Sequence, residues 1–221
     1  MLLCGVDEAG RGSVIGPLVV AGIMIKKSKT RNLDEIGVRD SKKLTRKKRN
    51  ALFYEILDIA EFTCVYKIGP KEIDESVLRN NLNKLEGRVM ANIINHLEGD
   101  IAYIDSCDVN IERYTMLLRS HLNPYNSNVK IFAMHKADIL NIAVSAASII
   151  AKVIRDKEIE NLQEQFHNIN IGSGYPADRR TMEFINNLIQ EKNNFPDFIR
   201  RSWSPVKNIL EKKQKKIYDF F

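Results

Sequence analysis

The chain has 221 residues, of which 44% are hydrophobic and 28% charged, values that fit one large globular domain with a small appendage. Its net charge of +6 and isoelectric point of about 9.1 favour an anionic partner such as nucleic acid, although a solvated lysine-rich surface gives the same totals. The three cysteines are scattered and the four histidines lack zinc-type spacing, which argues against a disulfide framework or a zinc site and for a reducing compartment.

Strands and helices are predicted along the whole chain. Runs rich in β-favouring residues predict strands at 2–6, 18–25, 61–68, 101–104 and 129–134. Apolar residues at helical spacing predict helices at 45–60, 82–97, 111–122, 139–166, 179–192 and 205–216. Asp40 and Ser41 are candidate caps of the first helix, and Asp178 is a candidate cap of the fifth. Early strands followed by alternating strands and helices predict an α/β fold with a mixed sheet.

The most apolar of these helices begins at residue 139 and is interrupted by several polar side chains. It therefore predicts a buried helix rather than a membrane span. The apolar run at the N-terminus is too short for a signal peptide and ends in acids. We therefore expect a cytoplasmic protein.

Three aspartates, Asp7, Asp105 and Asp138, each follow a predicted strand. Active groups gather at the carboxyl ends of strands in such sheets, so these residues can converge in space. Asp7 is followed by Glu8, and neighbouring carboxylates repel each other unless a positive charge lies between them. Oxygen ligands of this kind suit Mg²⁺ or Mn²⁺. From spacing alone, a metal site and ordinary capping or turn roles for Asp105 and Asp138 remain equally open.

Gly10, Arg11 and Gly12 follow the first two acids. Glycine lets backbone amides approach a ligand closely, and the arginine offers a fork of donors suited to phosphate. The alternative is a plain tight turn.

Other basic residues are candidates for contact with a nucleic-acid backbone. Lys42, Lys43 and Arg46 open a predicted helix and can contact phosphates, or can belong to a solvated helix face. Ser148 and Lys152 lie one helical turn apart, and they either reach a phosphate or pack near the acids.

Several blocks of the sequence, in this order, resemble the type 2 ribonuclease H family (ribonuclease HII). They are DEAGRG at 7–12, GP at 16–17, DSKKL at 40–44, YIDS at 103–106, HKAD at 135–138, VSAASIIAK at 144–152 and GSGYP at 172–176. A match over this many blocks in the order of the family is highly specific.

The resemblance implies a ribonuclease H-like mixed five-stranded sheet flanked by helices, with a smaller helical C-terminal part. We expect a catalytic domain at 1–166, a helical substrate-binding part at 167–213 and a tail at 214–221. The implied activity is Mg²⁺- or Mn²⁺-dependent hydrolysis of RNA in RNA–DNA hybrids by a two-metal mechanism. It includes nicking on the 5′ side of a ribonucleotide embedded in DNA, which leaves a 3′-hydroxyl and a 5′-phosphate.

The resemblance also implies roles for individual residues. The four carboxylate metal ligands of the family correspond to Asp7, Glu8, Asp105 and Asp138. The segment 10–12 looks like the sensor of the ribose 2′-hydroxyl, the group that distinguishes RNA from DNA. Tyr175 resembles the junction tyrosine, which packs on the sugar of the following deoxynucleotide. Without the family, a core aromatic would be the preferred interpretation of Tyr175.

The chain departs from the family pattern at three positions. Proline, an acid and a serine are common where this chain has Ser13, Met134 and Ala177. None of these differences removes a carboxylate, so activity is expected. Met134 is expected to change the electrostatics near Asp138 slightly.

The last eight residues, QKKIYDFF, resemble the peptide by which replication and repair proteins bind the ring-shaped sliding clamp. The key positions of this pattern are Gln214, Ile217, Phe220 and Phe221. The three apolar ones form a compact plug on one turn, suited to a groove. The alternative is a tail that folds back onto the core.

The sequence thus predicts a monomeric, clamp-associated ribonuclease HII that acts on RNA–DNA hybrids or ribonucleotide-containing DNA, with no membrane partner. One rival is the type 3 enzyme, whose members carry an extra N-terminal substrate-binding domain. Arg11 between two glycines, and the few residues before Asp7, favour type 2. The other rival is a non-catalytic hybrid-binding or clamp-adaptor protein, against which the retention of all four acids argues.

Overall fold

The structure is a computed structural model that describes residues 1–38, 44–167, 169–191 and 195–218, with side chains described as far as Gln214. This part of the chain forms two compact units that interleave in sequence. The first, which we call the sheet unit, comprises Met1–Ala9, Val19–Lys67 and Leu82–Ile154. The second, which we call the helical unit, comprises Gly10–Leu18, Ile68–Asn81 and the chain from Arg155 onward. The expected three-part division of the chain stays a prediction.

A mixed five-stranded sheet forms the centre of the sheet unit, as predicted. Its strands are β1 (Leu2–Ala9), β2 (Leu18–Lys26), β3 (Phe62–Ile68), β4 (Ile101–Asp105) and β5 (Lys130–Met134), in the order β3-β2-β1-β4-β5. Strand β1 is antiparallel to β2 and parallel to β4, which is in turn parallel to β5. The carboxyl ends of β1, β4 and β5 therefore lie side by side at one end of the sheet.

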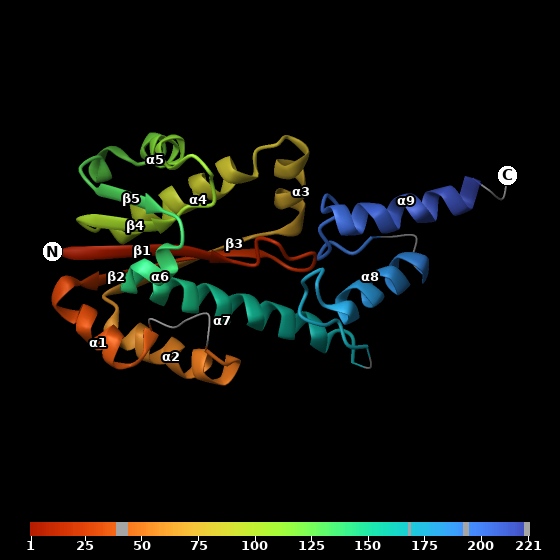
Figure 1. Ribbon diagram of the computed structural model, residues 1–221, viewed down its shortest axis with the longest axis horizontal. Coiled ribbons are helices and arrows are strands. Elements are labelled where there is room, and N and C mark those ends of the chain that lie inside the picture. Colours follow the sequence, from red (N-terminus) through yellow and green to blue (C-terminus); the bar gives the residue numbers. More distant parts are fainter. Residues whose placement is uncertain (39–43, 168, 192–194, 219–221) are drawn as a thin grey trace. The chain divides into compact units, whose positions relative to one another are not determined.

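Helices cover both faces of this sheet (Figure 1). One face carries α4 (Leu82–Leu97) and α5 (Ile111–Ser120), and the other carries α1 (Thr30–Glu35), α2 (Arg46–Ile59) and the first part of α7 (Ile142–Glu164). The short α6 (Ala137–Leu140) precedes α7. Apolar side chains of β2 pack with Leu52, Ile56 and Ile149 in the core on the α7 side.

The helical unit contains α3 (Pro70–Leu78), α8 (Arg179–Glu191), α9 (Ser204–Tyr218) and the rest of α7. Its core joins Phe184 and Ile185 of α8 to Ile159 of α7 and to Ile15. Ile15 also pairs with Ile199 in an isolated antiparallel bridge. No described helix has the length and apolarity that a membrane span requires.

The helix predictions differ from the structure in three respects. The helix predicted at 139–166 is two helices, because Asn141 has extended backbone and its side-chain oxygen caps the start of α7. The cap of α2 is Thr45, whereas the predicted caps Asp40 and Ser41 lie outside the described residues. The sequence did not predict α1 and α3, each of which buries a single residue and so leaves no periodic pattern.

Helix α7 lies directly against β1 at Gly5. A Cβ atom built on Gly5 would be 2.2 Å from the main-chain carbonyl carbon of Ala143, so only glycine allows this approach. Ser148 and Lys152 lie further along the same helix. The contact at Gly5 therefore sets how closely these two side chains approach the carboxyl end of β1.

Substitution of Gly5 by alanine is expected to destabilise the protein by about 1–3 kcal/mol, because the added methyl group meets helix backbone that cannot move aside. Thermal denaturation followed by circular dichroism would show a melting temperature lower by several degrees. The control is Gly69→Ser, at the start of α3, where a Cβ atom would have no neighbour within 4 Å. A Gly5→Ala protein as stable as wild type would contradict the close approach.

Candidate active site

Asp7 and Asp105 occupy the carboxyl ends of the neighbouring parallel strands β1 and β4. Asp7 lies inside β1 rather than after it, and its side chain is only 4% exposed. A chain of hydrogen bonds reaches Asp7 from α7. Lys152 Nζ donates to Ser148 Oγ over 2.7 Å, and the Ser148 hydroxyl donates to the carboxylate of Asp7. Of the two interpretations left open for Ser148 and Lys152, packing near the acids is therefore confirmed, and contact with phosphate stays a prediction.

Burial raises the pKa of Asp7 to about 7. The negative charge of Asp105 adds to the rise, whereas the hydrogen bond from Ser148 and the positive charge of Lys152 oppose it. A carboxyl group that keeps its proton this far above the usual range has too little positive charge around it. A divalent cation would supply that charge, and carboxylate oxygens are the ligands that such ions prefer.

Asp138 is brought close to Asp105 by a sharp turn between β5 and α6. Lys136 has a left-handed backbone conformation with φ of 58°, which is uncommon for a residue with a side chain. The N–H of Ala137 then donates to Asp105 Oδ1 over 2.7 Å, and the next residue, Asp138, is buried in the first turn of α6. Ser145 of α7 donates a hydrogen bond to the main-chain carbonyl of Asp138.

Glu8 lies on the opposite face of the sheet from Asp7, because successive side chains of an extended strand point to opposite faces. The negative charge of Glu8 acts on Cys107 and Tyr114. The same group contains Glu86, a completely buried residue of α4 that accepts a hydrogen bond from the Cys107 thiol. Burial, together with the charge of Glu86, raises the pKa of Cys107.

Within the described part of the chain, no three side chains of His, Cys, Asp or Glu meet where one ion would touch all of them. The acids instead accept hydrogen bonds from the backbone, at 2.8 Å from Glu8 N to Asp7 Oδ1 and 2.7 Å from Ala137 N to Asp105 Oδ1. The residues are nevertheless suited to bind a cation, because the carboxyl groups of Asp7 and Asp105 are neighbours and Asp7 is buried. The predicted set of four ligands stays a prediction.

The segment that follows β1 belongs to the helical unit, where Arg200 holds it. Arg200 is fully buried and donates to the carbonyl oxygens of Arg11 at 2.9 Å and Gly16 at 3.1 Å. The C=O and N–H groups of a trans peptide point in opposite directions, so the N–H of Gly12 points away from Arg200. Gly12 is exposed, and a Cβ atom built on it would have no neighbour within 4 Å. A ligand can therefore approach this peptide group.

The other predicted substrate-binding residues are found in different surroundings. Tyr175 is partly exposed, with the guanidinium carbon of Arg155 4.4 Å from its ring centroid. Arg46 is exposed at the start of α2. Lys42 and Lys43 lie outside the described residues.

The predicted clamp-binding residues lie at the end of α9. Gln214 is exposed, and the backbone of Ile217 continues the helix. Phe220 and Phe221 lie outside the described residues, so both the clamp-binding role and the folded-back alternative stay predictions.

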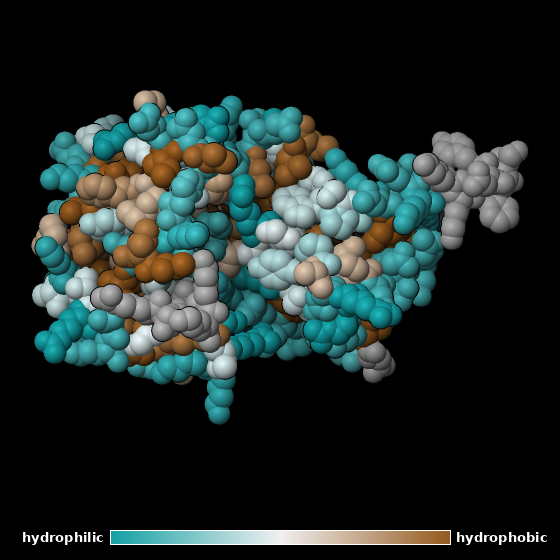
Figure 2. Space-filling model, viewed as in Figure 1, coloured by the Kyte–Doolittle hydropathy of each residue, from teal (hydrophilic) through white to brown (hydrophobic). Residues whose placement is uncertain are grey.

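The surface beside Asp138 is apolar. Figure 2 shows apolar side chains gathered over β4, β5 and α6. Exposed residues of this region include Phe132, which stacks on Tyr103 at 5.4 Å, and Ile139 and Leu140, which follow Asp138 directly. Exposed Lys136, the N-cap of α6, adds a positive charge next to this apolar surface.

Several buried polar side chains near the predicted site had no role predicted from the sequence. They are Ser13, noted only as a departure from the family pattern, and Glu86, Arg155 and Arg200. A detectable signal existed for Glu86, because it is a charged residue next to Leu85 in the apolar stripe of a predicted helix. A charged residue on the buried side of a helix is rarely tolerated without a polar partner, so its presence there indicates a buried polar contact.

This strand order, with acids at the carboxyl ends of adjacent parallel strands, defines a ribonuclease H-like hydrolase. The family model described as Ribonuclease HII matches residues 4–206. The chain therefore belongs to the ribonuclease HII family, whose members are metal-dependent endonucleases that cleave RNA in RNA–DNA hybrids. The predicted fold and enzyme class are confirmed, and the non-catalytic adaptor is not favoured.

Individual relatives cover nearly the whole chain. The ribonuclease HII of Cenarchaeum symbiosum is 46% identical over 209 residues, which are 95% of this chain and 98% of that protein. The crystal structure of ribonuclease H2 from Pyrococcus horikoshii is 40% identical with a TM-score of 0.89, covering 97% of this chain and 100% of that chain. The enzyme in the PCNA:RNase HII complex from Archaeoglobus fulgidus is 40% identical with a TM-score of 0.82. The match covers 92% of this chain and 96% of that chain.

The metal-free protein is expected to lose stability as the pH rises from about 4 to about 7, and to change little from this cause above that range. In this interval folded Asp7, with its pKa raised to about 7, keeps a proton that the unfolded chain releases near pH 4. Asp7→Asn should remove this loss and stabilise the metal-free protein at pH 8 by about 1–4 kcal/mol.

Thermal denaturation in EDTA at pH 5 and pH 8 measures both effects. Asp100→Asn is the matched control, since Asp100 is an exposed acid at the opposite end of β4. If Asp7→Asn and wild type show the same dependence on pH, the burial of a poorly compensated Asp7 is wrong.

Proposed function

We propose that this enzyme hydrolyses the RNA strand of RNA–DNA hybrids and nicks duplex DNA on the 5′ side of an embedded ribonucleotide. The products would be a 3′-hydroxyl and a 5′-phosphate. The observation that carries the proposal is the Asp7–Asp105 pair, with Asp7 buried, at the carboxyl ends of two parallel strands in a chain of the ribonuclease HII family. The net charge of +6 supports a polyanionic substrate.

Two divalent ions, Mg²⁺ or Mn²⁺, would be held by Asp7, Glu8, Asp105 and Asp138. When bound, such ions lower the pKa of water and stabilise charge on a departing oxygen, which is the chemistry that phosphodiester hydrolysis needs. The role of the surrounding residues is to orient the acids. Ser148 and Lys152 fix the carboxylate of Asp7, and the N–H of Ala137 fixes that of Asp105.

Selection of the ribose is assigned to the loop at Gly10–Gly12 and to Tyr175. The approachable peptide of Gly12 suits a 2′-hydroxyl, which accepts a hydrogen bond and which deoxyribose lacks. The partly exposed ring of Tyr175 suits packing against the next sugar. Contacts with the phosphate backbone would come from Arg11, Lys42, Lys43 and Arg46, and from Ser148 and Lys152 once the substrate is bound.

A role in replication and repair, with delivery by a sliding clamp, completes the proposal. The tail pattern at Gln214, Ile217, Phe220 and Phe221 supports it. Further support comes from the Archaeoglobus fulgidus relative, whose structure is that of a complex with PCNA. Attachment to a clamp raises the effective concentration of an enzyme on DNA without any change in its active site.

The activity is tested on a labelled DNA duplex with one ribonucleotide, in Mg²⁺ or Mn²⁺. The wild-type protein should nick it 5′ of the ribonucleotide and leave the all-DNA duplex intact. Asp105→Asn should reduce nicking by about 100-fold or more, since loss of an outer-shell partner of a metal site alone costs about 10- to 100-fold. Asp100→Asn, immediately before the same strand, should cleave normally. A wild-type protein that binds the duplex but does not nick it would overturn the proposal.

The tail is tested by direct binding to a sliding clamp. Alanine at Ile217, Phe220 and Phe221 should weaken binding by more than about 10-fold, because apolar anchors dominate such interfaces. Substitution of the intervening residues Tyr218 and Asp219 is the control and should have a small effect. Nicking without the clamp should be unchanged in both variants. Equal clamp affinity of wild type and the triple variant would rule out this binding mode.

A further inference from the structure

Arg155 connects the two segments to which ribose recognition is assigned. It lies on α7, is 4% exposed and belongs to the helical unit, as do both segments. Its Nη2 group donates to Ser13 Oγ over 2.9 Å and to the carbonyl of Ser173 over 2.6 Å. These bonds use both hydrogens of Nη2. The face of the guanidinium lies 4.4 Å from the ring centroid of Tyr175, a cation–π arrangement.

Ser13 carries the connection to the loop at Gly10–Gly12. Its side chain is fully buried, accepts the hydrogen bond from Arg155, and donates to the carbonyl of Gly174 at 2.8 Å or of Ile15 at 2.7 Å. Its backbone N–H donates to the carbonyl of Gly10 over 3.2 Å. Proline, the residue that the family resemblance leads one to expect at this position, has neither the hydroxyl nor the N–H.

Glycines from both segments make room for the same arginine. A Cβ atom on Gly10 would be 3.2 Å from Arg155 Cγ, and one on Gly174 would be 2.7 Å from Arg155 Nη2. Both glycines have positive φ, at +87° and +82°, which a side chain would also disfavour. The loop and the Tyr175 segment are therefore shaped around the arginine.

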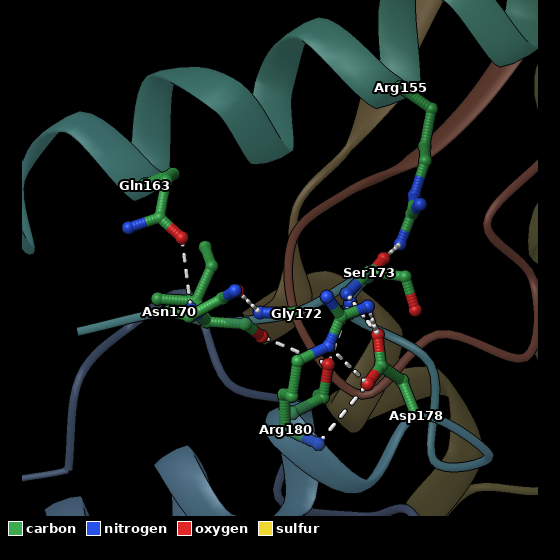
Figure 3. Close-up of polar contacts among 10 residues, drawn as sticks. Arg155, Gln163, Asn170, Gly172, Ser173, Asp178 and Arg180 are labelled. Atoms are coloured by element: carbon green, nitrogen blue, oxygen red, sulfur yellow. Dashed lines mark hydrogen bonds and ion pairs between the residues drawn. The ribbon is translucent and has the colours of Figure 1, made fainter. Parts of the chain in front are cut away.

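Other contacts fix the Tyr175 segment before any substrate binds (Figure 3). Gln163, two turns beyond Arg155 on α7, bonds to the backbone of Ile169 and Ile171. Asp178 accepts from the N–H of Ser173 at 2.8 Å. Backbone N–H groups of Val14 and Ile15 also donate to the carbonyl of Gly174, at 2.8 and 3.3 Å, so the segment is tied to the chain just after the loop as well. Arg155 and Ser13 add the side-chain connection, which alone reaches the ring of Tyr175.

The number of hydrogen bonds does not explain why arginine is used. Its Nε lies 3.5 Å from the Cβ position built on Gly10, is buried, and has no hydrogen-bond partner among the described residues. An unused buried donor costs about 1–3 kcal/mol. A planar fork is the group that can bond two segments from one nitrogen while its face covers an aromatic ring.

We propose that Arg155 and Ser13 are positioning residues that hold Tyr175 and the Gly10–Gly12 loop at a fixed separation, so that both engage the same ribonucleotide–deoxyribonucleotide junction. The inference rests on the proposed function of these two segments. It predicts that loss of either residue impairs recognition of a junction more than cleavage of uniform RNA, which presents no such junction.

The variants Arg155→Lys and Ser13→Ala test this on two substrates. For each variant, kcat/KM should fall about 10- to 100-fold on a duplex with one ribonucleotide, because a misplaced recognition group costs up to about 100-fold, and much less on a uniform RNA–DNA hybrid. In a Tyr175→Leu background, Arg155→Lys should not change the ratio of kcat/KM on the two substrates any further, because the side chain that Arg155 positions is gone. If the two residues had a merely structural role, the variants would lower kcat/KM on both substrates by the same factor. Their effect would then add to that of Tyr175→Leu.

Leu188→Ala is the matched control, since Leu188 is buried in α8 of the same unit. It should lower the melting temperature and leave the substrate ratio unchanged. A readout without activity is the ¹⁹F resonance of Tyr175 in fluorotyrosine-labelled protein, assigned through Tyr175→Phe. Arg155→Lys should move it and Leu188→Ala should not.

These measurements separate the inference from the function on which it rests. A wild-type protein without nicking activity would refute the proposed function, and the fluorine resonance would still test the positioning. An unchanged substrate ratio in both variants, or an unmoved Tyr175 resonance, would overturn the positioning role.

Discussion

The burial of Asp7 is the constraint on which the sheet unit depends. A carboxylate shielded from water is costly unless positive charge or hydrogen bonds stabilise it. The protein supplies part of this through Lys152 and Ser148, which reach Asp7 only because α7 packs against β1 at Gly5. The pKa of Asp7 nevertheless stays raised, to about 7, so the compensation is incomplete. A divalent cation would supply the positive charge that the carboxylate of Asp7 still lacks.

The rest of the sheet unit brings further acids to the same end of the sheet. The parallel pairing of β1, β4 and β5 aligns their carboxyl ends, and the left-handed turn at Lys136 places Asp138 next to the residue that bonds Asp105. Glu8 lies on the other face, with Glu86 and Cys107 near it.

Much of the fold could be predicted because its signals are local. Apolar runs located the five strands, and helical periodicity located α4 with its bounds unchanged. The short α1 and α3 bury too little to leave a pattern, and Asn141 divides the sixth and seventh helices through one side-chain cap. Asp7, Asp105 and Asp138 could be predicted as site residues because each follows a predicted strand. Spacing alone left a metal site and ordinary capping roles equally open, and only the family resemblance favoured the metal site.

The connections between distant segments could not be predicted in this way. The bond from Arg155 to Ser13 spans 142 residues and the bond from Arg200 to Arg11 spans 189. No periodicity or short motif relates residues so far apart, because their proximity is created by the packing of the helical unit itself. The residues expected to recognise ribose were therefore identified, while the buried arginines that hold them were not.

The location of a bound cation tests the central claim most directly. Crystals soaked in Mn²⁺ would show it by anomalous diffraction. The account predicts a peak in direct contact with the carboxylates of Asp7 and Asp105, and its loss in Asp7→Asn. A Mn²⁺ ion bound elsewhere in a protein that nicks its substrate, with both carboxylates empty, would contradict it.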